Sequence, residues 1–98
     1  DYCCQGMKST YKVVVGRSRN IEGPYLDRNG KDMADLGGTL VIEGDKKVFE
    51  AAGHCSAYSC QGKDYFLCHG YSVALKGASI LICKEISWTE DGWPTLKD

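Results

Sequence analysis

The fold class of this chain is best read from Ser9-Thr10-Tyr11-Lys12-Val13-Val14-Val15-Gly16-Arg17-Ser18. The run of β-branched residues predicts a strand, and Gly23-Pro24-Tyr25 predicts a turn soon after it. The same design returns near the end of the chain, where Ser79–Ser87 reads as a strand and Asp91-Gly92-Trp93-Pro94 as its turn. A strand-and-turn unit that recurs at a long interval is typical of radially repeated β architectures, which usually need about three or more repeats to close a core. We therefore expect the chain to be part of a larger object.

The rest of the sequence has the same character. Strands are expected at Thr10–Ser18, Thr39–Ile42, Lys47–Glu50, Cys55–Ser59, Tyr65–Tyr71 and Ser79–Trp88. The turn residues Glu43–Lys46 predict a hairpin that joins Thr39–Ile42 to Lys47–Glu50. The best helical candidate, Lys31–Leu36, is too short and runs into two glycines. The sequence predicts an all-β, antiparallel fold.

Composition limits the classes of function. The chain has 98 residues, enough for one small domain, and a net charge of −1 with no basic stripe, which excludes nucleic acid as the main partner. No apolar run approaches the ~18 residues of a membrane span. No signal peptide is visible, but the abrupt start at Asp1 suggests a piece of a longer chain whose secretory signal lies elsewhere. The expected location is secreted or periplasmic.

Six cysteines raise the possibility of a disulfide framework. They are Cys3, Cys4, Cys55, Cys60, Cys68 and Cys83. Cys68 and Cys83 lie inside apolar runs, where a free thiol acts as a small buried hydrophobe. Neither Cys3-Cys4 nor Cys55 with Cys60 has the spacing of a zinc site. Cys3-Cys4 is equally compatible with a vicinal disulfide and with free thiols.

His54 is the leading candidate for a functional side chain, because it follows the small residues Ala51-Ala52-Gly53 at the start of a strand. From the residues alone, an ordinary hydrogen-bonded histidine at a strand end is favoured over a ligand contact. His69 in mid-strand reads as a half-buried structural histidine. A nucleophilic pair of Cys55 with His54 is disfavoured, because neighbouring strand residues point to opposite faces.

The acidic and aromatic residues indicate a functional site less clearly than His54 does. The acidic residues lie in polar turns or at strand edges, and none shows the apolar surroundings that raise the pKa of a general acid. Aromatic rings are plentiful and serve both cores and sugar-binding clefts. Tyr2, Tyr11 and Tyr58 are the rings that we expect to contact a ligand.

Several motifs occur in a characteristic order. They are Cys3-Cys4, Ser9-Thr10-Tyr11, Val15-Gly16-Arg17-Ser18, Gly23-Pro24-Tyr25 with Asp27, Gly30-Lys31-Asp32-Met33, Gly37-Gly38-Thr39-Leu40, Gly53-His54 with Ser56, and Trp88 before Asp91-Gly92-Trp93-Pro94. Together they closely resemble the C-terminal part of the endo-1,5-α-L-arabinanases of glycoside hydrolase family 43. The resemblance covers essentially the whole chain.

This resemblance implies a five-bladed β-propeller, of which about two blades are present. Residues 1–45 would complete blade four, and residues 46–98 would form blade five. Catalysis in the family is inverting and uses a general acid Glu, a general base Asp and a second Asp. All three would lie upstream of Asp1, so no catalytic residue is assigned to this chain. The expected partners are arabinan or a related pentose oligosaccharide, and the remaining blades or a second copy of the chain.

The resemblance also assigns one site residue. His54 matches a histidine that helps to hold a hydrated metal ion, commonly calcium, near the propeller axis. From the aromatic residues themselves, Tyr11 and Tyr58 are the expected substrate-binding residues. Ala52, Cys55 and the run His69-Gly70-Tyr71-Ser72 depart from the family pattern, so xylan or arabinoxylan side chains stay open as substrates.

Two alternatives to a hydrolase fragment remain at this point. One is a non-catalytic carbohydrate-binding module derived from the same fold. The other is a small secreted β protein stapled by disulfides.

Overall fold

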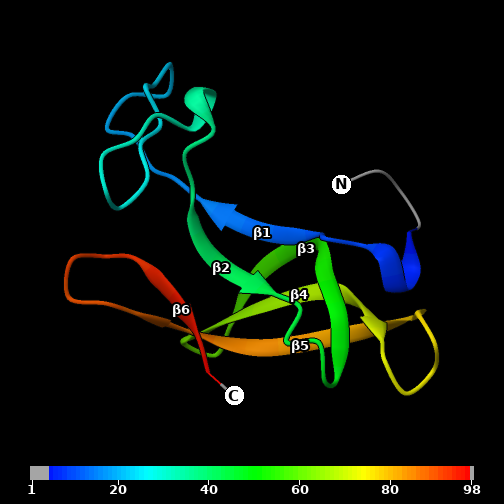
Figure 1. Ribbon diagram of the computed structural model, residues 1–98. Coiled ribbons are helices and arrows are strands. Elements are labelled where there is room, and N and C mark those ends of the chain that lie inside the picture. Colours follow the sequence, from blue (N-terminus) through cyan, green and yellow to red (C-terminus); the bar gives the residue numbers. More distant parts are fainter. Residues whose placement is uncertain (1–4, 98) are drawn as a thin grey trace.

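Two antiparallel sheets make up the computed structural model, which describes residues 5–97 (Figure 1). The first sheet contains β1 (Lys12–Val15) and β2 (Thr39–Glu43). The second contains β3 (Phe49–Cys60), β4 (Lys63–Ser72), β5 (Ala78–Trp88) and β6 (Pro94–Leu96), paired in that order. Two short 3₁₀ turns, η1 (Gly6–Lys8) and η2 (Met33–Asp35), are the helical segments of the described chain. The predicted all-β, antiparallel architecture is confirmed.

The expected hairpin around Glu43–Lys46 is wrong. β2 pairs with β1, and β3 pairs with β4, so the segment between β2 and β3 crosses from one sheet to the other. The carboxylate of Asp45 accepts hydrogen bonds from the backbone N–H groups of Lys47 and Val48, both at 2.8 Å. This side-chain cap turns the chain away from β2, and a local turn takes the place of the predicted ladder.

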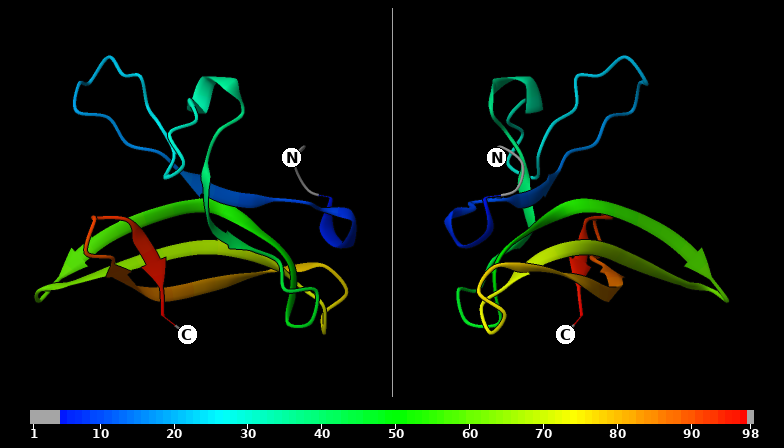
Figure 2. Two further views of the ribbon diagram at one scale, coloured as in Figure 1. Left: turned by 60° about the vertical axis from the view of Figure 1, so that its left-hand side comes forward. Right: turned by 90° about the vertical axis from the view of Figure 1, so that its right-hand side faces the viewer.

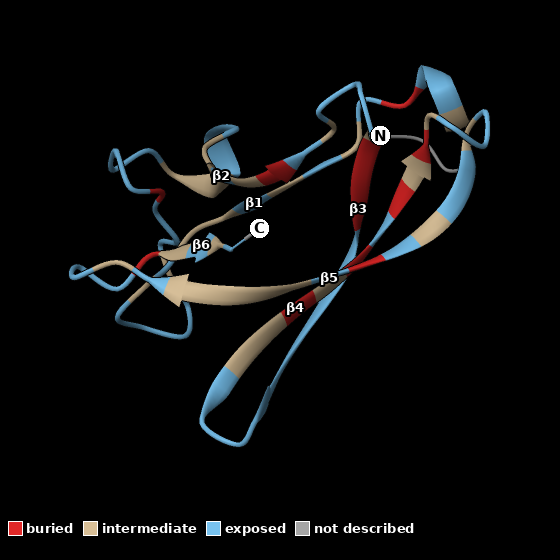
Figure 3. Ribbon diagram, turned by 90° about the horizontal axis from the view of Figure 1, so that it is seen from below, coloured by how far each residue is buried: buried red, intermediate tan, exposed pale blue. Residues whose placement is uncertain are grey.

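β3 also differs from the expectation of two short strands. It is one strand of 12 residues, and only its first part is buried. Figure 3 shows the buried stretches of β3 and β4 close to the first sheet, while the β3–β4 hairpin end is exposed. No described helix has the length and apolarity to cross a membrane.

The core lies between the two sheets and uses one face of the larger one. Along β4, Phe66 and Cys68 are buried at 6% and 1% exposure. Ile82 of β5 lies opposite Cys68 and shares this face, as does Ile42 of β2 in the facing sheet. Cys83 is exposed on the other face, so the expectation that it is a buried hydrophobe is wrong. Period-two alternation decides this, because Ile82 and Cys83 cannot both face the core.

The long connection between β1 and β2 extends away from the sheets, as the cyan segment of Figure 2 shows. It is organised by Asp27, whose carboxylate accepts hydrogen bonds from the backbone N–H groups of Asn29, Lys31 and Gly38, each at 2.9 Å. These hydrogen bonds lower the pKa of Asp27 below its ordinary value, and the bond from Gly38 has the largest effect. A buried carboxylate with three backbone donors fixes the loop without help from a sheet.

Candidate functional site

His54 lies in a β-bulge of strand β3. Gly53 pairs with His69, and Ser56 pairs with Leu67, so His54 and Cys55 together oppose one residue of β4. The backbone of His54 has φ of 54°, in the left-handed region. That conformation costs a non-glycine residue about 1–2 kcal/mol, so the surrounding structure must hold it there. Bulges of this kind redirect side chains and are common beside active sites.

The bulge also changes the relation between His54 and Cys55. Strict alternation, on which the argument against a Cys55–His54 pair relied, is interrupted between Gly53 and Ser56. Both side chains are exposed, and the structure gives no hydrogen bond between them. The bulge, rather than an activated thiol, is therefore the notable feature of this segment.

A hollow of about 570 Å³ lies beside the bulge. Its wall is formed by the segment before β1, by β3, by β4 and by the start of β5. The residues that matter here are Tyr11, Gly53, His54, His69, Tyr71 and Ser79. Its size is in the range of small-ligand pockets. The structure thus brings together two candidates that lie far apart in sequence, Tyr11 and His54.

Tyr11 reaches the hollow because β1 begins against the edge of β3. The Tyr11 carbonyl accepts a hydrogen bond of 3.2 Å from the N–H of Ala52. The Tyr11 N–H donates to Oγ of Ser9 at 3.0 Å, and Ser9 is only 1% exposed. The ring lies over Gly53, where a Cβ would come within 2.5 Å of Cε1 of Tyr11. A glycine is required at position 53 because the ring occupies that space.

His69 is part of the same site, contrary to the expectation of a half-buried structural histidine. It is exposed, and its ring centroid lies 5.7 Å from that of His54 with an interplanar angle of 63°. Sequence reasoning missed His69, Tyr71 and Ser79 as members of the site. The register of β4 was the missing signal, because it places His69 opposite Gly53 and Tyr71 opposite Ser79.

Tyr58 lies elsewhere. It is 55% exposed on β3, five residues beyond Gly53, which at about 3.3 Å per residue is roughly 16 Å along the strand. Its neighbour is Tyr65 across the β3–β4 pair, with ring centroids 5.7 Å apart. Tyr58 and Tyr11 therefore do not form one binding surface within this chain. Tyr2 lies outside the described residues.

The described residues do not by themselves fit a calcium site. Residues 5–97 contain no group of three or more His, Cys, Asp and Glu side chains placed to hold a metal ion. Calcium takes about six to eight oxygen ligands, whereas the hollow offers the imidazoles of His54 and His69. At most, this chain supplies one ligand to a shell completed by water or by other parts of the protein.

Five carboxylates of the described chain have a pKa that is lowered from its ordinary value. They are Asp27, Asp45, Asp64, Glu85 and Asp91. Hydrogen bonds are the first cause in each case; for Asp64 the donors are Ser59 and then Trp88. A general acid needs a raised pKa, so none of these five groups is suited to that role.

The described thiols are free. Cys55, Cys60 and Cys83 are exposed, and Cys68 is buried. Burial raises the pKa of Cys68 to about 11. No disulfide therefore staples the described strands, which removes support for the disulfide-stapled alternative. Cys3-Cys4 lies outside the described residues.

Comparison with known proteins gives a consistent result. The family model for glycosyl hydrolases family 43 matches residues 2–94. The extracellular exo-α-(1→5)-L-arabinofuranosidase ArbA of Cellvibrio japonicus is 43% identical over 96 residues, which are 98% of this chain and 27% of that protein. The extracellular endo-α-(1→5)-L-arabinanase 1 of Bacillus subtilis is 35% identical over 95 residues, which are 97% of this chain and 28% of that protein.

Solved structures agree with these relatives. An exo-1,5-α-L-arabinanase from a bovine ruminal metagenomic library superimposes with a TM-score of 0.95 at 50% identity, over 100% of this chain and 32% of that one. The α-L-arabinanase of Cellvibrio cellulosa complexed with arabinohexaose superimposes with a TM-score of 0.91 at 43% identity. This match covers 98% of this chain and 30% of that one. The chain thus spans about a third or less of the length of its relatives. Arabinanases of this kind are five-bladed β-propellers, so the expectation that the two sheets are part of such a propeller is confirmed. The division into blades at residue 45 stays a prediction.

Proposed function

Because this chain belongs to the glycosyl hydrolases of family 43, we propose that the complete protein hydrolyses α-1,5-linked arabinan or a related pentose polysaccharide. The chain contributes to the substrate cleft and leaves the catalytic carboxylates to the rest of the protein. One observation carries the proposal: an aromatic ring and two imidazoles converge on a bulged strand, in a chain that matches the family along nearly all its length. The relatives' names support secretion of the complete protein.

The hollow suits a sugar for simple chemical reasons. The Tyr11 and Tyr71 rings offer apolar surface to the C–H faces of a pentose, and the imidazoles offer hydrogen bonds to its hydroxyls. Tyr58 is proposed as a second, separate contact for a longer substrate. In an inverting reaction the acid and base stand about 6.5–9.5 Å apart with a water between them. Residues outside this chain supply that pair.

His54 is proposed to contribute one imidazole to a hydrated calcium ion whose other ligands are waters or groups outside this chain. Its exposure and its place on the bulge leave the ring accessible for this role. A calcium ion bound near the cleft would supply positive charge to the site. The remaining blades are the proposed partner of the open sheet edges, and a second copy of the chain is the alternative.

The test is an assay of the complete protein on debranched arabinan, with xylan and arabinoxylan as comparison substrates. We expect release of arabinose or arabino-oligosaccharides, with the inverted anomer appearing first in the proton NMR spectrum. The isolated chain should be inactive, and sustained turnover by residues 1–98 alone would contradict the placement of the carboxylates. Binding of arabino-oligosaccharides by the complete protein without hydrolysis would instead favour a carbohydrate-binding module.

A further inference from the structure

The left-handed backbone of His54 lies where the β3–β4 ladder is interrupted. The ladder is broken at the bulge, so strand pairing does not fix the two residues that oppose one. His54 is exposed, and its side chain makes no hydrogen bond within the described chain that would stabilise this backbone conformation. Ala52 and Gly53 pair with Gly70 and His69 of β4, so the ladder holds them on one side, and a contact from another strand can fix the direction in which the chain enters the bulge.

Tyr11 is in the right position to do so. It contacts β3 at two points on the N-terminal side of the bulge. Its carbonyl accepts a hydrogen bond from the Ala52 N–H, and its ring covers Gly53. A Cβ on Gly53 would lie 2.5 to 2.6 Å from Cε1, Cδ1 and Cε2 of the ring, closer than any real contact. The backbone of Tyr11 is in turn fixed by buried Ser9.

We propose that Tyr11 is a positioning residue: its ring clamps Gly53 and thereby sets the direction in which His54 points into the cleft. This role is additional to the contact of the Tyr11 ring with the sugar proposed above, because here the ring acts through its contact with β3. The part of the proposal that concerns catalysis rests on the proposed hydrolase function, whereas the geometry of His54 can be tested without substrate.

The experiment uses the complete protein with ¹³C-labelled histidine. The ring signal of His54 is identified as the one lost in His54→Gln. Gly53 lacks a positive φ, so Gly53→Ala adds only the methyl that meets the Tyr11 ring. We expect Gly53→Ala to shift the His54 signal, to lower kcat about tenfold or more, and to change KM less than about twofold.

A double-mutant cycle isolates the clamp. In a Tyr11→Ala background the ring is absent, so adding Gly53→Ala should shift the His54 signal no further and cost no more activity. Tyr11→Phe keeps the ring and should leave the His54 signal in place. Ser56→Ala, an exposed change just past the bulge, is the matched control and should also leave it in place.

Three results would overturn the proposal. One is a His54 signal that stays in place in Gly53→Ala or, where that variant does not fold, in Tyr11→Ala. Another is an equal effect of Gly53→Ala with and without the Tyr11 ring. The third is a KM that rises equally in Tyr11→Phe and Tyr11→Ala while the His54 signal stays in place in both. That result would make Tyr11 a substrate contact through its hydroxyl. Failure of the complete protein to cleave arabinan would refute the proposed function, and the NMR comparison would still decide on the clamp.

Discussion

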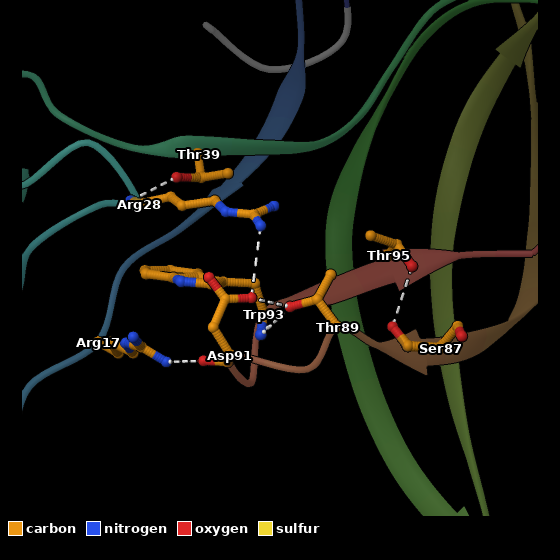
Figure 4. A network of polar contacts seen from close by, with 8 residues as sticks. All are labelled: Arg17, Arg28, Thr39, Ser87, Thr89, Asp91, Trp93 and Thr95. Carbon is orange, nitrogen blue, oxygen red and sulfur yellow. Dashed lines mark hydrogen bonds and ion pairs between the residues drawn. The ribbon is translucent and has the colours of Figure 1, made fainter.

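The guanidinium of Arg17 lies 4.4 Å from the ring centroid of Trp93, which is 4% exposed. The same guanidinium donates a hydrogen bond of 2.6 Å to the backbone carbonyl of Asp91 (Figure 4). Arg17 follows β1, and Trp93 precedes β6, so this contact ties the loop of the first sheet to the last turn of the second. The motifs Val15-Gly16-Arg17-Ser18 and Asp91-Gly92-Trp93-Pro94, which lie far apart in sequence, therefore each supply half of one contact.

Removal of this contact should loosen the junction of the two sheets. A cation–π contact at a partly exposed site contributes about 0.5–1 kcal/mol, and a charged hydrogen bond about 1.5–3 kcal/mol. We expect Arg17→Ala to lower the free energy of unfolding of the complete protein by about 2 kcal/mol. Chemical denaturation measures this loss of stability, and Arg19→Ala, at an exposed position, is the control. Equal losses in the two variants would contradict the role given to Arg17.

The Asp27 loop predicts a pH dependence. The folded pKa of Asp27 is lowered, so its contribution to stability is full above the unfolded value of about 3.9 and is lost as pH falls through the folded pKa. Asp27→Asn should therefore destabilise the protein at pH 7, and the gap to wild type should shrink at pH 2–3. Urea unfolding at both pH values measures the gap, with Asp35→Asn in exposed η2 as the control. A gap that stays constant with pH would contradict the assignment.

Much of the fold could be predicted because period-two patterns are local. Ser79–Trp88 was expected and β5 runs from Ala78 to Trp88; in its first half the exposed Leu81 and Cys83 alternate with the more buried Ile80 and Ile82. The route between sheets could not be predicted in this way. Glu43–Lys46 looks like a hairpin turn, but pairing depends on which strand lies alongside, and β1 takes the place beside β2.

The candidate site, like the fold, could be predicted from the sequence only in part. His54 and Tyr11 were found from residue type and from family resemblance, and both line the hollow. His69 was misjudged, because a bulge between Gly53 and Ser56 leaves no mark in the apolar pattern. The requirement for Gly53 follows from a ring that lies 42 positions earlier in sequence (53 − 11), which only the structure places there.

The crossover between the sheets should tolerate no side chain at Gly44. A Cβ there would lie 1.8 Å from the backbone oxygen of Glu50, and backbone cannot move aside as a flexible side chain can. Gly44→Ala should lower the free energy of unfolding by about 2 kcal/mol or more. Gly62→Ala, at a turn with open space around it, is the comparison and should cost about 1 kcal/mol through its φ of 78° alone. Thermal unfolding of both variants ranks them, and a milder effect at Gly44 would refute the close approach.

The thiols of this chain should differ sharply in reactivity. Cys68 is 1% exposed and has a pKa of about 11, so at pH 8 only about 0.1% of it is thiolate even where reagent can reach it. Cys60 is exposed at the β3–β4 turn. In native complete protein, iodoacetamide should modify Cys60 within minutes and leave Cys68 unmodified until denaturant is added, as peptide mass spectrometry would measure. Modification of Cys68 at the rate of Cys60 would mean that the β4 face against β2 is open to solvent, and the packing of the two sheets described above would then be wrong.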